Sequence, residues 1–172
     1  FLEKLQTATP AALYGAMLAG VDAILMGAGI PREIPQLMTD FAQGKSGHLS
    51  IDSDRPAGMA APILEFDPLE SFGKAPELPR PAFLAIVTAE VLASYLARNE
   101  VTRPDGFVVE HFMAGGHNAP PRRMQDTETG YGPLDEANIP KVADVGLPFW
   151  LAGGRATPAS VTDAINLGAQ GV

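Results

Sequence analysis

The fold is decided at residues 106–122, which read Gly106-Phe-Val-Val-Glu-His-Phe-Met-Ala-Gly-Gly-His-Asn-Ala-Pro-Pro-Arg122. Residues 107–109 are consecutive aromatic or β-branched residues, which suits a strand buried on both faces of a parallel sheet. Gly115 and Gly116 then remove two side chains, so the backbone can adopt positive φ or approach a ligand closely. Chemistry is therefore expected just beyond the end of this strand.

His117 lies at the tip of this glycine-rich segment. A histidine can change charge near neutral pH, and one that follows a glycine pair beyond a strand is placed to face a ligand. The same local sequence also suits a glycine-rich turn whose histidine only caps a backbone carbonyl. Taken alone, the segment leaves both interpretations open.

The composition excludes several classes of protein. A length of 172 residues with 46% hydrophobic residues predicts one domain with a sizeable core. Twelve basic against twenty acidic residues give a net charge of −8, so nucleic-acid binding is not expected. Cysteine is absent, and no apolar run reaches the roughly 18 residues of a membrane span. We expect a cytoplasmic protein that does not interact with membranes.

Strands and helices alternate along most of the chain. Proline and glycine positions and apolar spacing predict helices at residues 10–19, 31–44, 89–99, 138–145 and 158–167. Short apolar runs predict strands at residues 21–26, 83–87 and 148–152, in addition to the strand that starts at residue 106. This alternation indicates an α/β fold with a parallel sheet.

Residues 45–81 interrupt the alternation with repeated prolines. We predict an irregular insertion here, placed over the mouth of the fold, because a loop this long in a compact domain is usually functional. Within it, residues 48–51 and 63–66 are short extended pieces that can pair with each other.

An internal repeat extends the prediction beyond a simple sheet. Residues 8–11 and 156–159 have the same sequence, Ala-Thr-Pro-Ala, and at the same separation Ala16 matches Ala164 and Gly20 matches Gly168. The first copy precedes a strand, so a strand is also expected near residue 171. The chain then begins inside one βα unit and ends inside another, which predicts part of a (β/α)8 TIM barrel over residues 1–172. Such a chain should not close a barrel alone, and a second copy or a complementing chain segment is the expected partner.

With these residues laid out, the chain resembles the nitronate monooxygenase family, also called 2-nitropropane dioxygenase-like proteins. These are FMN-binding (β/α)8 barrels related to flavin-dependent enoyl reductases. The matching segments are residues 20–31, 108–110, 114–122, 131–132 and 146–154, of which the Ala-Gly-Gly-His sequence at residues 114–117 is the most specific.

The resemblance implies roles for individual residues. His117 corresponds to the catalytic or substrate-positioning histidine beside the flavin. Gly153 and Gly154 correspond to the pair whose backbone N–H groups bind the FMN phosphate. The cofactor-binding set expected for this chain is Gly27, Glu110, Gly115, Gly116, Gly153 and Gly154. For Glu110, a plain strand-end carboxylate hydrogen-bonded to loop N–H groups remains an alternative.

The implied activity is the FMN-dependent oxidation of alkyl nitronates or similar carbon acids, with a small-molecule substrate and dioxygen as partners. An NAD(P)H-dependent enoyl-thioester reductase using the same flavin site is the alternative enzyme, and a truncated or degenerate barrel acting as a scaffold is the non-enzyme alternative. The chain departs from the family pattern at His111 and Met113, where the family commonly has glycine and an acidic residue. No metal site is expected, since no His-x-x-x-His pair or facial carboxylate triad is present.

Overall fold

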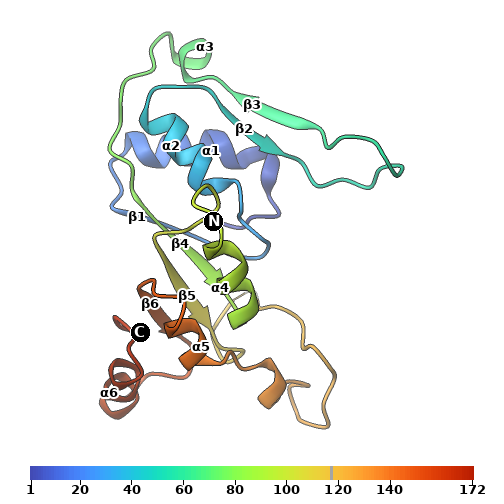
Figure 1. Cartoon of the computed structure of the whole chain (residues 1–172), viewed down its shortest axis with the longest axis vertical. Coiled ribbons are helices and arrows are strands. Elements are labelled where there is room, and N and C mark those ends of the chain that lie inside the picture. The colour runs from blue at the N-terminus through green and yellow to red at the C-terminus, as the bar shows by residue number, and fades with distance from the viewer. Residues whose placement is uncertain (117) are drawn as a thin grey trace.

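A parallel sheet forms the centre of the molecule. The computed structural model describes residues 1–116 and 118–172. In these residues the sheet has four strands in the order β1-β4-β5-β6 (Figure 1). Their bounds are β1 (Ala23–Met26), β4 (Ala82–Val87), β5 (Gly106–Glu110) and β6 (Phe149–Ala152). The order in the sheet is the order in the chain, so the chain steps in one direction across the sheet.

Helices separate the strands, as the sequence predicted. Their bounds are α1 (Thr9–Leu18), α2 (Ile34–Ala42), α4 (Glu90–Ala97), α5 (Ile139–Ala143) and α6 (Pro158–Asn166), with short 3-10 turns η1 (Gln6–Ala8) and η2 (Pro133–Asp135). The α/β fold with alternating strands and helices is therefore confirmed. The start of the second helix was predicted wrongly: α2 begins at Ile34 rather than at Pro31, and Pro35 occupies its first turn, where a missing N–H is tolerated.

Both outer edges of the sheet carry further backbone contacts, and the one at the β1 edge is parallel. At the β1 edge, Leu2 forms a parallel bridge with Gly27, and the Glu3 N–H donates to the Gly27 carbonyl at 2.8 Å. At the β6 edge, the Leu151 N–H donates to the Gly171 carbonyl at 3.1 Å. A strand was predicted near residue 171, but the described residues form none there; only backbone hydrogen bonds join residues 170 and 171 to β6.

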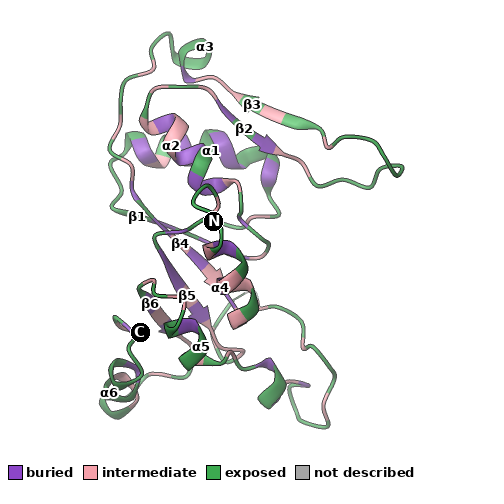
Figure 2. Ribbon diagram, in the orientation of Figure 1, coloured by how far each residue is buried: buried purple, intermediate pink, exposed green. Residues whose placement is uncertain are grey.

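The helices bury only one face of the sheet. Strand residues on this face form one core with side chains of α1, α2, α4, α5 and α6. On the opposite face, Leu25 is exposed, and Val108 and Trp150 are only half-buried (Figure 2). The prediction that β5 is buried on both faces is therefore wrong, because no described helix covers the face that carries Val108. None of the helices in the described part of the chain has the length and hydropathy needed to cross a bilayer.

The insertion at residues 45–81 contains regular structure. Strands β2 (Gly47–Ser50) and β3 (Ile63–Phe66) pair antiparallel, as predicted. Helix α3 (Pro68–Phe72) was not predicted, because the prolines seemed to preclude a helix. Pro68 occupies the first helical turn, and the Asp67 carboxylate caps the helix by accepting from the Leu69 N–H at 2.7 Å.

The hairpin β2–β3 packs on α1 and α2 through aromatic rings. The Tyr14 ring lies 5.3 Å from Phe41 and 5.7 Å from Phe66, measured between centroids. Beyond the hairpin strands, the connecting loop extends away from the sheet (Figure 1). The insertion therefore lies along the helices and does not line the cavities at the ends of β4 and β5.

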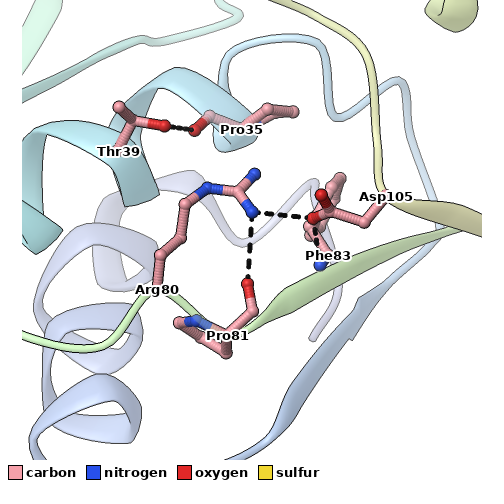
Figure 3. Close-up of polar contacts among 6 residues, drawn as sticks. All are labelled: Pro35, Thr39, Arg80, Pro81, Phe83 and Asp105. Atoms are coloured by element: carbon pink, nitrogen blue, oxygen red, sulfur yellow. Dashed lines mark hydrogen bonds and ion pairs between the residues drawn. The ribbon is translucent and has the colours of Figure 1, made fainter.

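A polar clamp fastens the amino-terminal end of the sheet. Asp105, just before β5, accepts from Arg80 Nη1 at 2.8 Å and from the Phe83 N–H at 2.7 Å through the same carboxylate oxygen. Arg80 Nη1 also donates to the Pro81 carbonyl at 3.3 Å (Figure 3). The clamp ties the start of β5 to the start of β4.

Candidate functional site

The carboxyl ends of β1, β4 and β5 surround a cavity of about 340 Å³. Ala28 follows β1, Thr88 follows β4, and Glu110 ends β5, and all three line the cavity. Its apolar wall includes Ile30, Ile86 and Leu92. Cavities of about 300–1,000 Å³ with a few polar groups are typical of small-molecule sites, and ligands of parallel α/β sheets bind at this end of the strands.

A smaller cavity of about 50 Å³ adjoins the first. The two share Thr88, Glu110 and Asn118, and the smaller one adds the side of the loop that contains Arg122 and Tyr131. The loop after β5 therefore forms one wall of both cavities.

Glu110 is the predicted site residue that lines both cavities. It is half-buried at the end of β5 and lies opposite Ala152 of β6 in the sheet register. His117, the predicted catalytic residue, lies outside the described residues, so its role stays a prediction.

Gly27 has a packing reason to be glycine. A Cβ at this position would lie 2.9 Å from the Cβ of Ile86, which lines the larger cavity. Gly27 itself lines neither of these two cavities. It affects the larger one by leaving room for Ile86 and by preceding Ala28, which both line it.

Gly153 and Gly154, which follow β6, lie against the first part of the loop after β5, at residues 113 and 114. A Cβ on Gly153 would lie 2.6 Å from the Ala114 backbone nitrogen, and one on Gly154 would lie 3.7 Å from Met113 Sδ. Gly153 and Gly154 both have positive φ, of 95° and 70°. The backbone conformation thus favours glycine at both positions. At Gly153, the close contact with the loop after β5 is a second reason for glycine.

Gly115 and Gly116 differ from each other. Gly116 has a φ of 96°, a conformation that favours glycine. Gly115 is not among the residues with positive φ, and a Cβ there would meet no described atom within 4 Å. Gly115 is exposed and lines neither cavity, so the described residues give no packing reason for glycine there.

Two features of the site were missed by the sequence analysis. Asn118 Nδ2 donates to the carbonyls of Phe112 and Ala114 at 3.2 and 2.9 Å, while its Oδ1 is buried and has no hydrogen-bond partner among residues 1–116 and 118–172. Ala28, which lines the larger cavity, has a φ of 58°. The Gly27-Ala28-Gly29 sequence signals a tight turn but not which residue takes the strained conformation, and nothing local signals the unsatisfied amide.

Asp135 organises the far part of the loop that follows β5. Its side chain is 8% exposed and accepts from the N–H groups of Arg122 at 2.7 Å and Gly132 at 3.0 Å. The hydrogen bond from the Arg122 N–H is the main cause that lowers the pKa of the Asp135 carboxyl. Tyr131 adds a hydrogen bond from its hydroxyl to the Ala119 carbonyl at 2.7 Å and stacks on Phe112 at 5.3 Å between ring centroids.

A third cavity, of about 310 Å³, lies beside the end of β1. It brings together the carboxylates of Glu3, Glu33 and Asp52, and burial raises the pKa of Glu3. Glu33 accepts from the Ser50 N–H and hydroxyl, so it joins the hairpin to α2. Within the described ranges, no group of three or more histidine or acidic side chains is arranged to hold a metal ion.

No protein-family model matches the chain. A search of curated proteins likewise finds no relative.

Proposed function

We propose that the chain forms part of a (β/α)8 barrel, and that this barrel is an FMN-dependent oxidoreductase acting on alkyl nitronates or similar carbon acids. The architecture supports the first part. The strands are parallel and follow chain order, the described helices bury one face, and both outer edges bear additional backbone hydrogen bonds. A barrel uses these features, because its second face is closed by its own strands.

The site supports a flavin as the bound group. Gly115 leaves open space where a planar ring or a phosphate could approach the backbone, and Gly116, Gly153 and Gly154 provide turns of positive φ at the ends of β5 and β6. In this proposal Gly153 and Gly154 hold the phosphate, and Gly27, Glu110, Gly115 and Gly116 lie on the side of the ring. When bound, FMN would accept the electrons of the substrate and return them to dioxygen.

The chain's own residues would then position the substrate and move one proton. His117 takes the α-proton of a neutral nitroalkane, or donates a hydrogen bond to the preformed anion. Ile30, Ile86 and Leu92 pack around the alkyl part and exclude water from the reacting carbon. The observation that carries the proposal is the contact of Gly153 with Ala114 at the carboxyl end of the sheet, directly before Gly115 in the chain.

Two measurements on the full chain test the proposal. Titration with FMN should quench flavin fluorescence with saturable binding, whereas riboflavin, which lacks the phosphate, should bind at least about tenfold more weakly, as expected for the loss of charge-assisted hydrogen bonds. In a barrel that turns over substrate, His117→Asn should lower activity on neutral nitroalkane by about 10²–10⁴-fold. The preformed nitronate needs no deprotonation and should lose far less.

Each alternative predicts a different result. Absence of saturable FMN binding would favour the scaffold. FMN binding together with NADH oxidation that depends on an enoyl thioester, and no turnover of nitronate, would assign the site to the enoyl reductase. The apolar wall of Ile30, Ile86 and Leu92 is the feature that would accept an acyl chain in that case.

A further inference from the structure

His111 uses three of its polar groups to form the turn that leaves β5. Its N–H donates to the Ala152 carbonyl of β6 at 2.9 Å, and its carbonyl accepts from the Ala114 N–H at 2.8 Å. Its ring accepts as well, because the Met113 N–H donates to His111 Nδ1 at 3.1 Å. An accepting Nδ1 places the ring hydrogen of the neutral imidazole on Nε2.

The turn at residues 111–114 connects β5 to Gly115 and contacts the second glycine pair. Ala114 lies against Gly153, Met113 lies near Gly154, and Gly115 follows directly. Asn118 Nδ2 donates to the carbonyls of Phe112 and Ala114, so the same turn also orients the amide that lines both cavities. A change in this turn would therefore alter both the contact with Gly153 and the position of the Asn118 amide.

We propose that His111 is a positioning residue for the candidate site, and that the acceptor Nδ1 of its neutral ring holds the 111–114 turn in the arrangement that binds ligand. The inference rests on the proposed FMN site. His111 is one of the positions where the chain departs from the family pattern, so this device belongs to this chain.

A charge on the ring would act against the turn. A proton on Nδ1 converts the acceptor into a donor, which removes the partner of the Met113 N–H. Among the described residues, the charged group that forms an ion-pair contact with the ring is Glu136, after η2, whose Oε1 lies 3.7 Å from His111 Nε2. Glu110 precedes His111 on β5, and the ring of Phe112 lies 4.1 Å from the histidine ring. Glu136 attracts the charged ring from the Nε2 side, but it cannot replace the acceptor on the Nδ1 side.

Two substitutions at His111 distinguish the contribution of the hydrogen-bond acceptor from that of the aromatic ring. His111→Asn keeps an acceptor, because an asparagine side chain can accept from the N–H two residues later in the chain. His111→Phe keeps a ring against Phe112 but has no acceptor. Far-ultraviolet circular dichroism and the fluorescence of Trp150, the sole tryptophan, check that both variants keep the fold.

The first measurement is amide exchange at Met113 and Ala114, which needs no bound ligand. We expect His111→Phe to speed exchange at Met113 by about tenfold, the loss of one net hydrogen bond, and His111→Asn to stay within about twofold of the original chain. Unchanged exchange in His111→Phe, or equal acceleration in both variants, would overturn the role of the acceptor.

The second measurement is FMN affinity at pH 8. We expect His111→Phe to bind about tenfold more weakly at pH 8. We also expect His111→Asn to bind FMN within about twofold of the original chain at the same pH. If exchange responds to His111→Phe while FMN affinity does not, the turn is structural only and this inference fails. If the original chain does not bind FMN at all, the proposed function fails with it, whereas the exchange result still decides whether Nδ1 holds the turn.

Discussion

The two ends of the parallel sheet use their polar groups differently. At the amino-terminal end, one oxygen of Asp105 accepts from both Arg80 and the Phe83 N–H, so donors and acceptor are matched. At the carboxyl end, Asn118 Oδ1 is buried without a hydrogen-bond partner among the described residues, and Ala28 holds a φ of 58°.

This difference shows at which end of the sheet the local costs in folding free energy lie. An unsatisfied buried acceptor costs about 1–3 kcal/mol, and a non-glycine residue in the left-handed region costs about 1–2 kcal/mol. Both costs fall at the cavity and not at the clamp, which is the distribution expected of a binding site. If this assignment is right, changes at the amino-terminal end should lower stability, and changes at the carboxyl end should alter binding.

The largest loss of stability is expected from Gly106→Val at the amino-terminal end. A Cβ on Gly106 would lie 2.8 Å from the Pro148 carbonyl oxygen and 3.0 Å from Leu84 Cδ2. The carbonyl belongs to the backbone and cannot turn aside, so we expect a loss of about 3 kcal/mol in the free energy of unfolding, measured with urea. Gly15→Ala, which adds a Cβ in open space on α1, is the control and should be neutral or stabilising by up to about 1 kcal/mol. Equal stability of Gly106→Val and the original chain would contradict the packing of β5 against β6.

A smaller loss is expected at the clamp itself. Asp105→Ala removes the acceptor of both Arg80 and the Phe83 N–H, and we expect a loss of about 1–2 kcal/mol. The pair is partly exposed, so the backbone hydrogen bond should account for most of it. Asp105→Asn retains an acceptor for the Phe83 N–H and should recover more than half of the loss in the same urea titration. FMN affinity should not change in either variant, and a change would mean that the two ends of the sheet are coupled.

Much of the fold could be predicted from the sequence, because its signals are local. The Thr-Pro pairs marked the starts of α1 and α6, and the apolar runs marked the strands of the sheet. Helix α3 escaped prediction because its prolines were counted as breakers, although Pro68 occupies a permitted first-turn position after the Asp67 cap. The burial of β5 was also predicted wrongly, since composition reports that a strand is apolar but not how many of its faces are covered.

The candidate site was less predictable for a physical reason. Glu110 could be identified because it ends a strand, and its place at the cavity follows from the parallel sheet. Asn118 and Asp135 depend on contacts across the loop after β5, and such contacts leave no periodic pattern in the sequence. The sequence analysis weighted the five glycines of the predicted set equally, whereas the structure separates Gly115 from Gly153 by what surrounds each.

A local effect is expected when Asp135 is protonated. Its folded-state pKa is lowered from 3.8, chiefly by the hydrogen bond from the Arg122 N–H. The ionised form is therefore favoured by folding, so its contribution is complete above about pH 4 and is lost as the pH falls through the lower folded-state pKa. Amide NMR shifts of Arg122 and Gly132 should move together over that acid range. In Asp135→Asn they should already differ at neutral pH and show no such acid transition, and a transition that persists in this variant would assign the effect to another carboxylate.

The smallest change in stability is expected from Gly115→Ala, and this variant best separates the two ends of the sheet. Gly153 is unsuitable for the purpose, because a side chain there would collide with Ala114 whether or not a ligand binds. At Gly115 the added methyl group meets no described atom within 4 Å, and the residue does not have a positive φ. The free energy of unfolding should therefore stay within about 0.5 kcal/mol of that of the original chain. A ligand that approaches the backbone would still meet the methyl group, and FMN affinity should fall by about tenfold or more, the effect of about 1.4 kcal/mol.

Gly116→Ala is the matched control next in the chain: its φ of 96° should make alanine cost about 1–2 kcal/mol of stability. Loss of stability in Gly115→Ala would show that glycine serves folding there, and full stability with unchanged FMN affinity would place the ligand away from the loop after β5.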